Sequence, residues 1–441
     1  MQGFPHFCKW GEELLDILNK LCYTYRQGGV IWLLVQSSIT QGIAIKVKLD
    51  LQHNEDVSKI INTMEQYRQA CNYISEYIFT HGFQLNPLKL QKEIYNDIRV
   101  MFGLKSMMAQ SAIRSTIARY KTVKTKLKQN PYKFQDKNTK KWYRVFRNLE
   151  WLDKPINFVR PQVDLVRNRD WSKLANGKLS INTLGGRIFA TPICSDNFER
   201  YFSSDWKLGS AKLIEHGGNW YLHISATRLI ENVTTEQITH VVGIDRGIRF
   251  HAVCYDEQGK VTFFSGSKAR TKRNKFAKVR AELQSKSTKS AKRVLKRISG
   301  RENRWMTDIN HCLSKTLVKK YGENTLFVLE DLTGVTFDEN NLKGSSRGRY
   351  EKRSWAFYQL EQFLIYKANL NHSAVLKVPA QYTSQRCPKC GYVDKKSRNH
   401  KYHIFKCKCG YCSNDDRVGA MNIQQLGVRY ALGEENLKLT A

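Results

Sequence analysis

Five cysteines crowd into one short stretch near the end of the chain, and this cluster constrains the fold more than any other feature. Cys387 and Cys390 enclose Pro-Lys and precede a glycine, so two thiolates can hold one metal ion while the backbone turns beneath it. The second half of the cluster is irregular, because Cys407 and Cys409 are separated by a single residue and Cys412 offers a third thiol. A glycine follows Cys409 as it follows Cys390, which favours Cys407 and Cys409 as the second pair; Cys409 with Cys412 is the alternative. This spacing predicts a structural Zn²⁺ site in a zinc ribbon.

The charge balance indicates the kind of partner. The chain has 73 Lys and Arg against 39 Asp and Glu, a net charge of +34. Self-repulsion of this size weakens the compact state unless a polyanion neutralises it, and nucleic acid is the commonest such partner. The basic residues run along nearly the whole chain, whereas a membrane-bound protein would concentrate them in one amphipathic helix. Because the most apolar run, Val30–Val35, is too short to span a bilayer and clustered thiols favour a reducing compartment, we expect a cytoplasmic protein without membrane contact.

The hydrophobic periodicity predicts a multidomain α/β protein. An alternating strand over residues 43–49 precedes three amphipathic helices, the first capped by Asn54 and the second by Asn86. Residues 130–235 show short strands and glycine-rich hairpin signals, which are typical of a β-barrel. If the strand at 43–49 belongs to that barrel, the helices are an insertion between its strands.

Three carboxylates lie at the ends of predicted secondary-structure elements that could meet in the folded protein. Asp245 and Glu330 each end a short buried strand, and Asp416 stands at the start of a predicted helix just after the cysteine cluster. A lone acid in such a place is usually a cap, but two strand ends and a helix start can meet at one edge of a sheet. Carboxylates that meet there repel unless a cation lies between them, and Mg²⁺ prefers such oxygen ligands. Two ions could activate a water and stabilise the departing oxygen of a phosphodiester.

A basic helical stretch over residues 268–304 could bind a nucleic-acid backbone. The alternative is an ordinary solvated helix face. The residues expected to bind nucleic acid are Lys272, Arg273, Lys275, Lys278, Arg280, Lys292, Arg293, Lys296 and Arg297. Residues 342–348, after Glu330, are expected to form either a mobile lid over the site or a simple surface loop.

Four motifs together resemble a known family. They are GIDRG at 243–247, LEDL at 329–332, TSQRCPKCG at 383–391 and NDDRVGAMNI at 414–423. Their order, with the ribbon between the second acid and the third, resembles a split RuvC-type nuclease. The closer resemblance is to the transposon-encoded TnpB family, relatives of the miniature type V CRISPR effectors.

The resemblance implies an RNA-guided DNA endonuclease with an RNase H-like (RuvC) core. Asp245, Glu330 and Asp416 would be its catalytic acids and hold two Mg²⁺ ions, with Asp331 and Asp415 in support. Guide RNA and double-stranded target DNA would be its partners, and cleavage beside a short flanking motif would leave 5′-phosphate and 3′-hydroxyl ends. The alternatives are a miniature type V CRISPR effector, an RNA-guided repressor that binds DNA without cutting it, and a DNA-strand-transfer transposase.

The resemblance also implies a plan of domains. In chain order these are an N-terminal extension of unknown role (1–42), a wedge strand (43–53), a helical recognition domain (54–127), a β-rich wedge domain (128–237), a first part of the RuvC nuclease (238–384), the zinc ribbon (385–412) and a second part of the RuvC nuclease (413–441).

Overall fold

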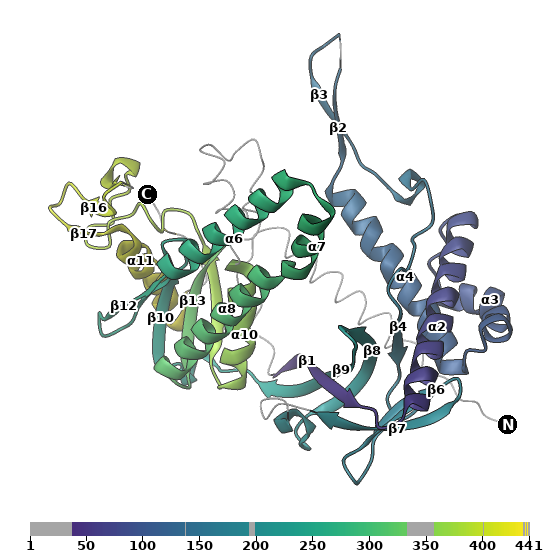
Figure 1. Cartoon of the computed structure of the whole chain (residues 1–441). Coiled ribbons are helices and arrows are strands. Elements are labelled where there is room, and N and C mark those ends of the chain that lie inside the picture. The colour runs from purple at the N-terminus through teal and green to yellow at the C-terminus, as the bar shows by residue number, and fades with distance from the viewer. Residues whose placement is uncertain are drawn as a thin grey trace, which may run out of the picture. The chain divides into compact units, whose positions relative to one another are not determined.

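The computed structural model describes residues 38–441 except 137, 194–198, 333–356, 400, 435–436, 438 and 440–441. Most of the expected N-terminal extension and the whole of the expected lid at 342–348 lie outside the described residues. The chain forms two compact units, one of residues 40–228 and one of residues 229–441 together with Ser38 and Ile39 (Figure 1). In the part of the chain that is described, no helix combines the length and the apolar character that crossing a membrane requires.

The unit of residues 40–228 is built on a seven-stranded sheet with the order β4-β8-β9-β1-β7-β6-β5. Its strands are β1 (Ser38–Asp50), β4 (Gln162–Leu165), β5 (Trp171–Lys173), β6 (Leu179–Thr183), β7 (Gly186–Ile193), β8 (Lys207–His216) and β9 (Asn219–Glu231). The first strand lies inside this order, antiparallel to β7 with Lys48 opposite Ile193, so the following helices interrupt the sheet in sequence. Among the described strands none joins β4 to β5, so the order is open at both ends.

Three helices follow β1: α2 (Asn54–Thr80), α3 (Pro87–Phe102) and α4 (Ser106–Gln129). Their apolar faces meet, and Ile74, Ile94 and Ile113 are among the buried residues. The expected cap of the second helix is present, since the Asn86 side chain accepts hydrogen bonds from two backbone N–H groups of α3. The expected cap of the first is wrong by one residue: His53 is the N-cap, without a side-chain bond, and Asn54 is already helical.

A two-stranded ribbon continues from the end of α4. It pairs β2 (Tyr132–Gln135) with β3 (Trp142–Val145), and all eight strand residues are exposed. Figure 1 shows it running out from the end of α4, away from the seven-stranded sheet. The 3-10 turn η2 (Leu149–Trp151) follows and packs near α4.

The other unit contains a five-stranded sheet with the order β12-β11-β10-β13-β14. Its strands are β10 (His240–Asp245), β11 (Phe250–Tyr255), β12 (Val261–Ser265), β13 (Thr325–Asp331) and β14 (Ala374–Pro379). The strands β10, β13 and β14 are parallel, whereas β11 and β12 return as an antiparallel hairpin. The carboxyl ends of three strands therefore lie at one edge of the sheet.

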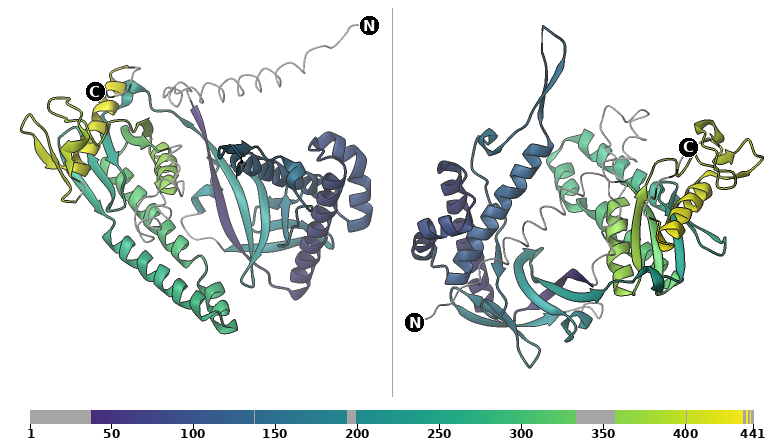
Figure 2. Two further views of the ribbon diagram at one scale, coloured as in Figure 1. Left: turned by 90° about the horizontal axis from the view of Figure 1, so that it is seen from above. Right: turned by 180° about the vertical axis from the view of Figure 1, so that it is seen from behind.

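Helices cover both faces of this sheet. On one face α8 (Arg301–Tyr321) and α10 (Phe357–Leu370) pack against Val242, Ile244 and Phe327. On the other face α11 (Asp415–Ala431) packs against Val241 and Val328. Neighbouring residues of each strand face opposite helices because successive side chains alternate across a sheet. Figure 2 shows the sheet between the green helices and the yellow helix α11 in both views.

Two smaller substructures extend from this unit. The helices α6 (Ser267–Lys286) and α7 (Lys289–Ile298) form a basic pair that leads into α8. A three-stranded sheet with the order β15-β16-β17 lies between β14 and α11 in the sequence and holds the cysteine cluster. Its strands are β15 (Arg398–Asn399), β16 (Ile404–Lys406) and β17 (Cys412–Asn414).

Candidate active site

The structure brings the three acids named in the sequence to one edge of the five-stranded sheet. Asp245 is the last residue of β10 and Glu330 lies near the end of β13, and the parallel register places Ile244 opposite Leu329 just before them. Asp416 is the second residue of α11, the helix that packs on β10. The three acids interact through their charges, since Glu330 and Asp416 both raise the pKa of Asp245.

The start of α11 is shaped to hold its acids. The Asn414 side chain caps the helix by accepting hydrogen bonds from the backbone N–H groups of Asp416 and Arg417, each at 3.1 Å. Acidic residues in a first helical turn are also favoured by the helix dipole. The neighbouring Asp415 side chain is fully buried, whereas that of Asp416 keeps 18% of its surface exposed. Asp416 is therefore the acid of this pair that a ligand can reach.

Two glycines allow α11 to lie directly on β10. A Cβ atom on Gly243 would stand 2.2 Å from the carbonyl oxygen of Ala420, a backbone atom that cannot move aside. A Cβ atom on Gly419 would stand 2.7 Å from Oδ2 of Asp245. The close approach that brings Asp416 near Asp245 thus depends on positions without side chains.

The electrostatics of the site favour the uncharged acids. Burial is the largest cause that raises the pKa of Asp245 well above its usual range, and the charges of Glu330 and Asp416 add to it. Burial also raises the pKa of Glu330, opposed by a hydrogen bond from Thr383 and by nearby arginines. Burial and then the charge of Asp415 raise the pKa of Asp416. Carboxylates held together in this way are poised to take up a cation, which would let all three ionise.

The oxygen-only donor set suits Mg²⁺ more than a soft metal. Among the described residues, two sets of at least three potential ligands have ligand atoms within 4.8 Å of one another: four thiols, and His403 with Asp415 and Asp416. Asp245 and Glu330 belong to neither set. The oxygen atoms of the three candidate acids therefore do not all lie within 4.8 Å of one another in this structure.

Two arginines that the sequence analysis missed contact this edge. Arg398, from β15 of the ribbon, places Nε 2.9 Å from Asp415 Oδ2 and Nη2 3.4 Å from Asp416 Oδ1. Arg246 places Nη1 2.9 Å from Glu361 Oε2 and donates from Nη2 to the backbone oxygen of Glu330 at 2.6 Å. Arg246 stands beside Asp245 within the first motif, but no local signal marks Arg398, because its partners lie beyond the turn of the ribbon.

The segment between β14 and the ribbon is tied to the acids by hydrogen bonds. The Thr383 hydroxyl donates to a carboxylate oxygen of Glu330. The Asn422 side chain of α11 donates to the backbone oxygens of Thr383 at 2.7 Å and Arg386 at 2.8 Å. These bonds connect the second, third and fourth sequence motifs into one network around the site.

The zinc ribbon brings together the four thiols that the sequence analysis favoured on the basis of the glycines after Cys390 and Cys409. Cys387, Cys390, Cys407 and Cys409 form one of the sets within 4.8 Å, whereas Cys412 lies outside it, opposite Lys406 in the β16–β17 ladder. The Sγ–Sγ distances are 3.7 Å between Cys387 and Cys409 and 3.5 Å between Cys390 and Cys407. Zn–S bonds of about 2.3 Å in a tetrahedron place sulfur atoms about 3.8 Å apart, so the cluster could hold Zn²⁺.

The basic residues expected to bind nucleic acid on α6 and α7 fall into two groups. Seven of them are exposed, namely Lys272, Lys275, Lys278, Lys292, Arg293, Lys296 and Arg297. The other two, Arg273 and Arg280, form ion pairs with the buried Glu302 of α8. The sequence analysis did not identify Glu302. Its negative charge offsets the positive charge of these two arginines and so weakens their attraction for phosphates. Lys272 lies 4.4 Å from the ring centre of Trp305.

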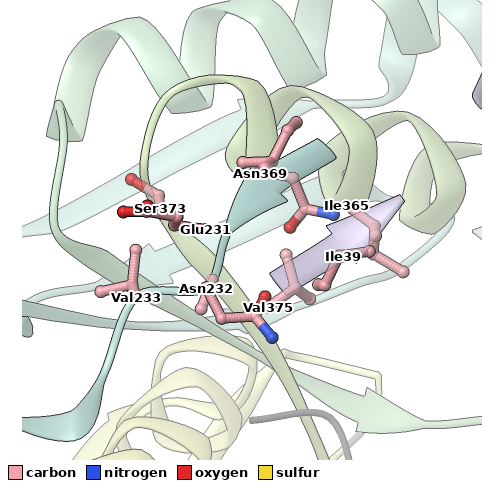
Figure 3. A pocket seen from close by; sticks show the side chains of 10 residues that line it. Ile39, Glu231, Asn232, Val233, Ile365, Asn369, Ser373 and Val375 are labelled. Atoms are coloured by element: carbon pink, nitrogen blue, oxygen red, sulfur yellow. The ribbon is translucent and has the colours of Figure 1, made fainter. Parts of the chain in front are cut away.

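Figure 3 shows a small cavity in the same unit, and none of the three acids is among the residues that line it. It is lined by Ile39, Ile365 and Val375, among others, and by Ser373, which precedes β14. It is therefore at the amino end of that strand, opposite the carboxyl edge that carries the acids. Its volume of about 50 Å³ has room for little more than one water molecule.

Two family models match the chain. The model described as "Cas12f1-like, TNB domain" matches residues 357–423, which include α10, β14 and the ribbon. The model described as "Probable transposase" matches residues 225–334, from β9 to the end of β13. The acids Asp245 and Glu330 lie in the second match and Asp416 in the first.

Individual proteins with similar sequences include CRISPR-associated nucleases and a TnpB-like protein. The chain is 27% identical over 248 residues to the CRISPR-associated endodeoxyribonuclease Cas12f1 of Sulfoacidibacillus thermotolerans, covering 51% of this chain and 55% of that protein. It is 26% identical over 268 residues to the TnpB-like protein MJ0751 of Methanocaldococcus jannaschii, covering 57% and 91%. The match spans about half the length of the Cas12f1 relatives. The chain is thus a relative of the TnpB family and of the miniature type V effectors, as its motifs predicted.

A solved structure is similar over most of the chain. The Cas12f1–sgRNA–target DNA complex contains a chain that matches with a TM-score of 0.54 at 13% identity, covering 88% of this chain and 99% of that one. At this identity the likeness concerns the fold alone. It confirms the expected multidomain α/β class.

Proposed function

We propose that this protein is an RNA-guided DNA endonuclease that hydrolyses phosphodiester bonds beside a short flanking motif. The observation that carries the proposal is the meeting of Asp245, Glu330 and Asp416 at one sheet edge, with the pKa of each raised by burial. A net charge of +34 supplies the attraction for nucleic acid. Relatives named as an endodeoxyribonuclease and as a putative RNA-guided DNA endonuclease support the same reaction.

The proposed domains follow from the two units. The five-stranded sheet has three parallel strands and an antiparallel hairpin, the pattern of an RNase H-like nuclease, and the ribbon interrupts it before α11. The seven-stranded sheet, a nearly closed barrel, would be the wedge domain, and α2, α3 and α4 would be its inserted recognition domain. Acting on cellular DNA, the protein would work in the cytoplasm of a prokaryote.

The three acids would hold two Mg²⁺ ions, which when bound supply an activated water and charge stabilisation for the leaving oxygen. The protein's own part is to keep the acids in place. Arg246 holds the backbone at Glu330, and the Thr383 hydroxyl orients the Glu330 side chain. Asp415, buried against Arg398, anchors the start of α11 that carries Asp416.

The exposed lysines and arginines of α6 and α7 would contact the backbone of the guide RNA or of its duplex with target DNA. Such contacts read the shape of a helix, while base pairing with the guide would read the target sequence. Arg273 and Arg280 would instead fix α6 against α8 through Glu302. The seven exposed cations are therefore the residues that we propose as the nucleic-acid surface.

The test is to purify the protein with its co-transcribed RNA and offer a matching target flanked by randomised sequence. Cutting in Mg²⁺ and its loss in EDTA are expected. Asp245→Ala should abolish cutting and leave RNA and target binding intact. The matched control is Asp308→Ala, which removes an exposed acid of α8. Cutting by the Asp245 variant at the wild-type rate, or no cutting with any flank, would refute the proposal.

Other functions give different results in the same experiment. A repressor would bind the target without cutting it even in Mg²⁺. A DNA-strand-transfer transposase, favoured by the description of one family model, would join DNA strands without RNA. A miniature type V effector would carry RNA transcribed from a CRISPR repeat array, whereas a transposon-borne nuclease would carry RNA from its element, so sequencing the bound RNA separates these two.

A further inference from the structure

The β2–β3 ribbon has two chemically different faces. Tyr132, Phe134, Tyr143 and Val145 share one face, because Tyr132 pairs with Val145 and Phe134 with Tyr143. They are 50%, 38%, 44% and 40% exposed. The opposite face carries Lys133 beside Arg144 and Gln135 beside Trp142. We call the first the aromatic face.

The aromatic face is a platform of nearly parallel rings. Tyr132 and Phe134 have ring centres 6.0 Å apart with 25° between their planes, and Phe134 and Tyr143 are 5.7 Å apart at 24°. Trp151 adds a fourth ring 5.8 Å from Tyr132. Inserting a base between two rings needs two stacking distances of about 3.4 Å. These rings are closer than that, so a base would have to stack on their outer surface.

The surroundings of this platform are strongly basic. Besides Lys133 and Arg144, the cations Lys140, Lys141 and Arg147 lie on the same ribbon or at its base. The last turn of α4, from which the ribbon continues, adds Lys126 and Lys128. A second copy of this chain would bring the same positive charges together, which opposes self-association through this face.

An isolated two-stranded ribbon is marginally stable in water at best. A contiguous exposed apolar patch rimmed by charged residues often marks a binding surface. The partner should therefore be present for most of the life of the protein and combine flat apolar rings with negative charge. Unpaired nucleotides meet both conditions, whereas the bases of a duplex hide their faces in the stack.

We propose that the aromatic face binds unpaired nucleotides of the guide RNA by base stacking, while the adjacent lysines and arginines hold the phosphates. The identity of this partner rests on the proposed function, under which the RNA is bound in the resting complex and the DNA only during a reaction. The β2–β3 ribbon would then bind the RNA scaffold through residues other than those of the α6–α7 surface.

The test measures RNA affinity in the absence of DNA. The variant Phe134→Leu/Tyr143→Leu keeps apolar side chains in the ribbon but removes two rings. We expect it to bind the co-purified RNA, and a 20-nucleotide oligouridylate probe, about 5- to 160-fold more weakly for each base that no longer stacks. The slope of log affinity against log salt should stay unchanged, because every cation that faces a phosphate is still present. The matched control, Phe189→Leu, alters a 55% exposed ring on β7 and should bind as the wild type does.

A companion variant separates charge from stacking. Lys133→Gln/Arg144→Gln should keep the rings and reduce the salt slope by about 0.7 for each phosphate that is no longer neutralised. In the unmodified protein, RNA containing 5-bromouridine should crosslink on irradiation to the peptide with Tyr132 or Tyr143. This readout does not depend on a variant that could misfold.

Wild-type RNA affinity of the Leu variant, or crosslinks confined to other peptides, would overturn the inference. So would an RNA-free dimer that the Leu variant dissociates, since the partner would then be a second copy. A protein that crosslinks RNA here yet cuts no DNA would contradict the proposed endonuclease activity and leave this inference standing.

Discussion

Gly419 offers a way to disturb the candidate active site without disturbing the fold. It lies in α11, and the three atoms nearest to an added Cβ all belong to the Asp245 side chain, at 2.7, 3.1 and 3.6 Å. Gly427 lies two turns later in the same helix, where a Cβ would meet Val328 Cγ2 at 2.3 Å and Val241 Cγ1 at 2.9 Å. Both Gly→Ala changes insert one methyl group, but only the first is aimed at an acid.

The expected magnitudes differ in a way that separates function from stability. Alanine in place of glycine stabilises a helix interior by about 1 kcal/mol. At Gly419 this gain roughly offsets the cost of turning Asp245 away from its rotamer, about 0.5–1.5 kcal/mol. At Gly427 the methyl meets stiff, buried valines, and overpacking costs about 1–3 kcal/mol, so the same helix gain leaves a net cost of up to about 2 kcal/mol. A displacement of about 1 Å at a reacting group costs about a hundredfold in rate.

The assay compares RNA-guided cleavage rates and thermal midpoints of the two variants. Gly419→Ala should unfold within a few degrees of the wild type and cut about a hundredfold more slowly. Gly427→Ala should unfold earlier by a few degrees and cut at nearly the wild-type rate when assayed below its midpoint. Equal cleavage by the wild type and Gly419→Ala would show that Asp245 does not act where the structure places it.

Three further predictions address the acids, the thiols and a buried ion pair. In EDTA, Asp245→Asn should have a larger free energy of unfolding than the wild type at pH 8, and this difference should shrink toward pH 5 in chemical denaturation. Because the pKa of Asp245 is raised in the folded protein, the folded wild type binds a proton that the unfolded chain has lost, and its stability falls as pH rises. A difference that does not depend on pH would contradict this. Cys409→Ser should lower the zinc content measured by mass spectrometry and Cys412→Ser should not; the reverse result would move the fourth ligand to Cys412. Arg246→Met should lower the free energy of unfolding by about 3–5 kcal/mol, because the buried Glu361 would lose the arginine at 2.9 Å and keep Lys377 at 3.6 Å. A cost below about 1 kcal/mol would show that the Arg246–Glu361 pair contributes little to stability.

The features that could be predicted from the sequence are those marked by neighbouring residues in the chain. An apolar run that ends in an acid marks Asp245 and Glu330 without knowledge of any partner, and a glycine after a cysteine distinguishes Cys409 from Cys412. The ion pairs of Arg398 could not be predicted in this way, since whether it faces Asp415 depends on the path of the ribbon. The role of Glu302 was hidden for the same reason: it is one acid in a basic stretch until α6 and α8 pack together.

The β2–β3 ribbon shows a second limit of sequence patterns. Residues 130–235 read as one β-rich module, and alternation alone does not tell whether an apolar face meets a core or solvent. The rings of Tyr132 and Tyr143 look like core residues in the sequence, but their strands lie outside the seven-stranded sheet. His53 replaced Asn54 as the first cap because either residue can precede the same helical pattern, and only the backbone angles decide.

The zinc ribbon holds both the cysteine cluster and Arg398, whose guanidinium group contacts Asp415 and Asp416 at the candidate active site. Without metal, backbone hydrogen bonding lowers the pKa of the exposed Cys409 to about 7, which makes its thiolate open to oxidation. An oxidant that joined two of these sulfurs as a disulfide would remove them as ligands for a metal ion and would disturb the ribbon that places Arg398 beside Asp415. If the proposed nuclease activity is correct, oxidation would then lower it even though no cysteine is among the three candidate catalytic acids.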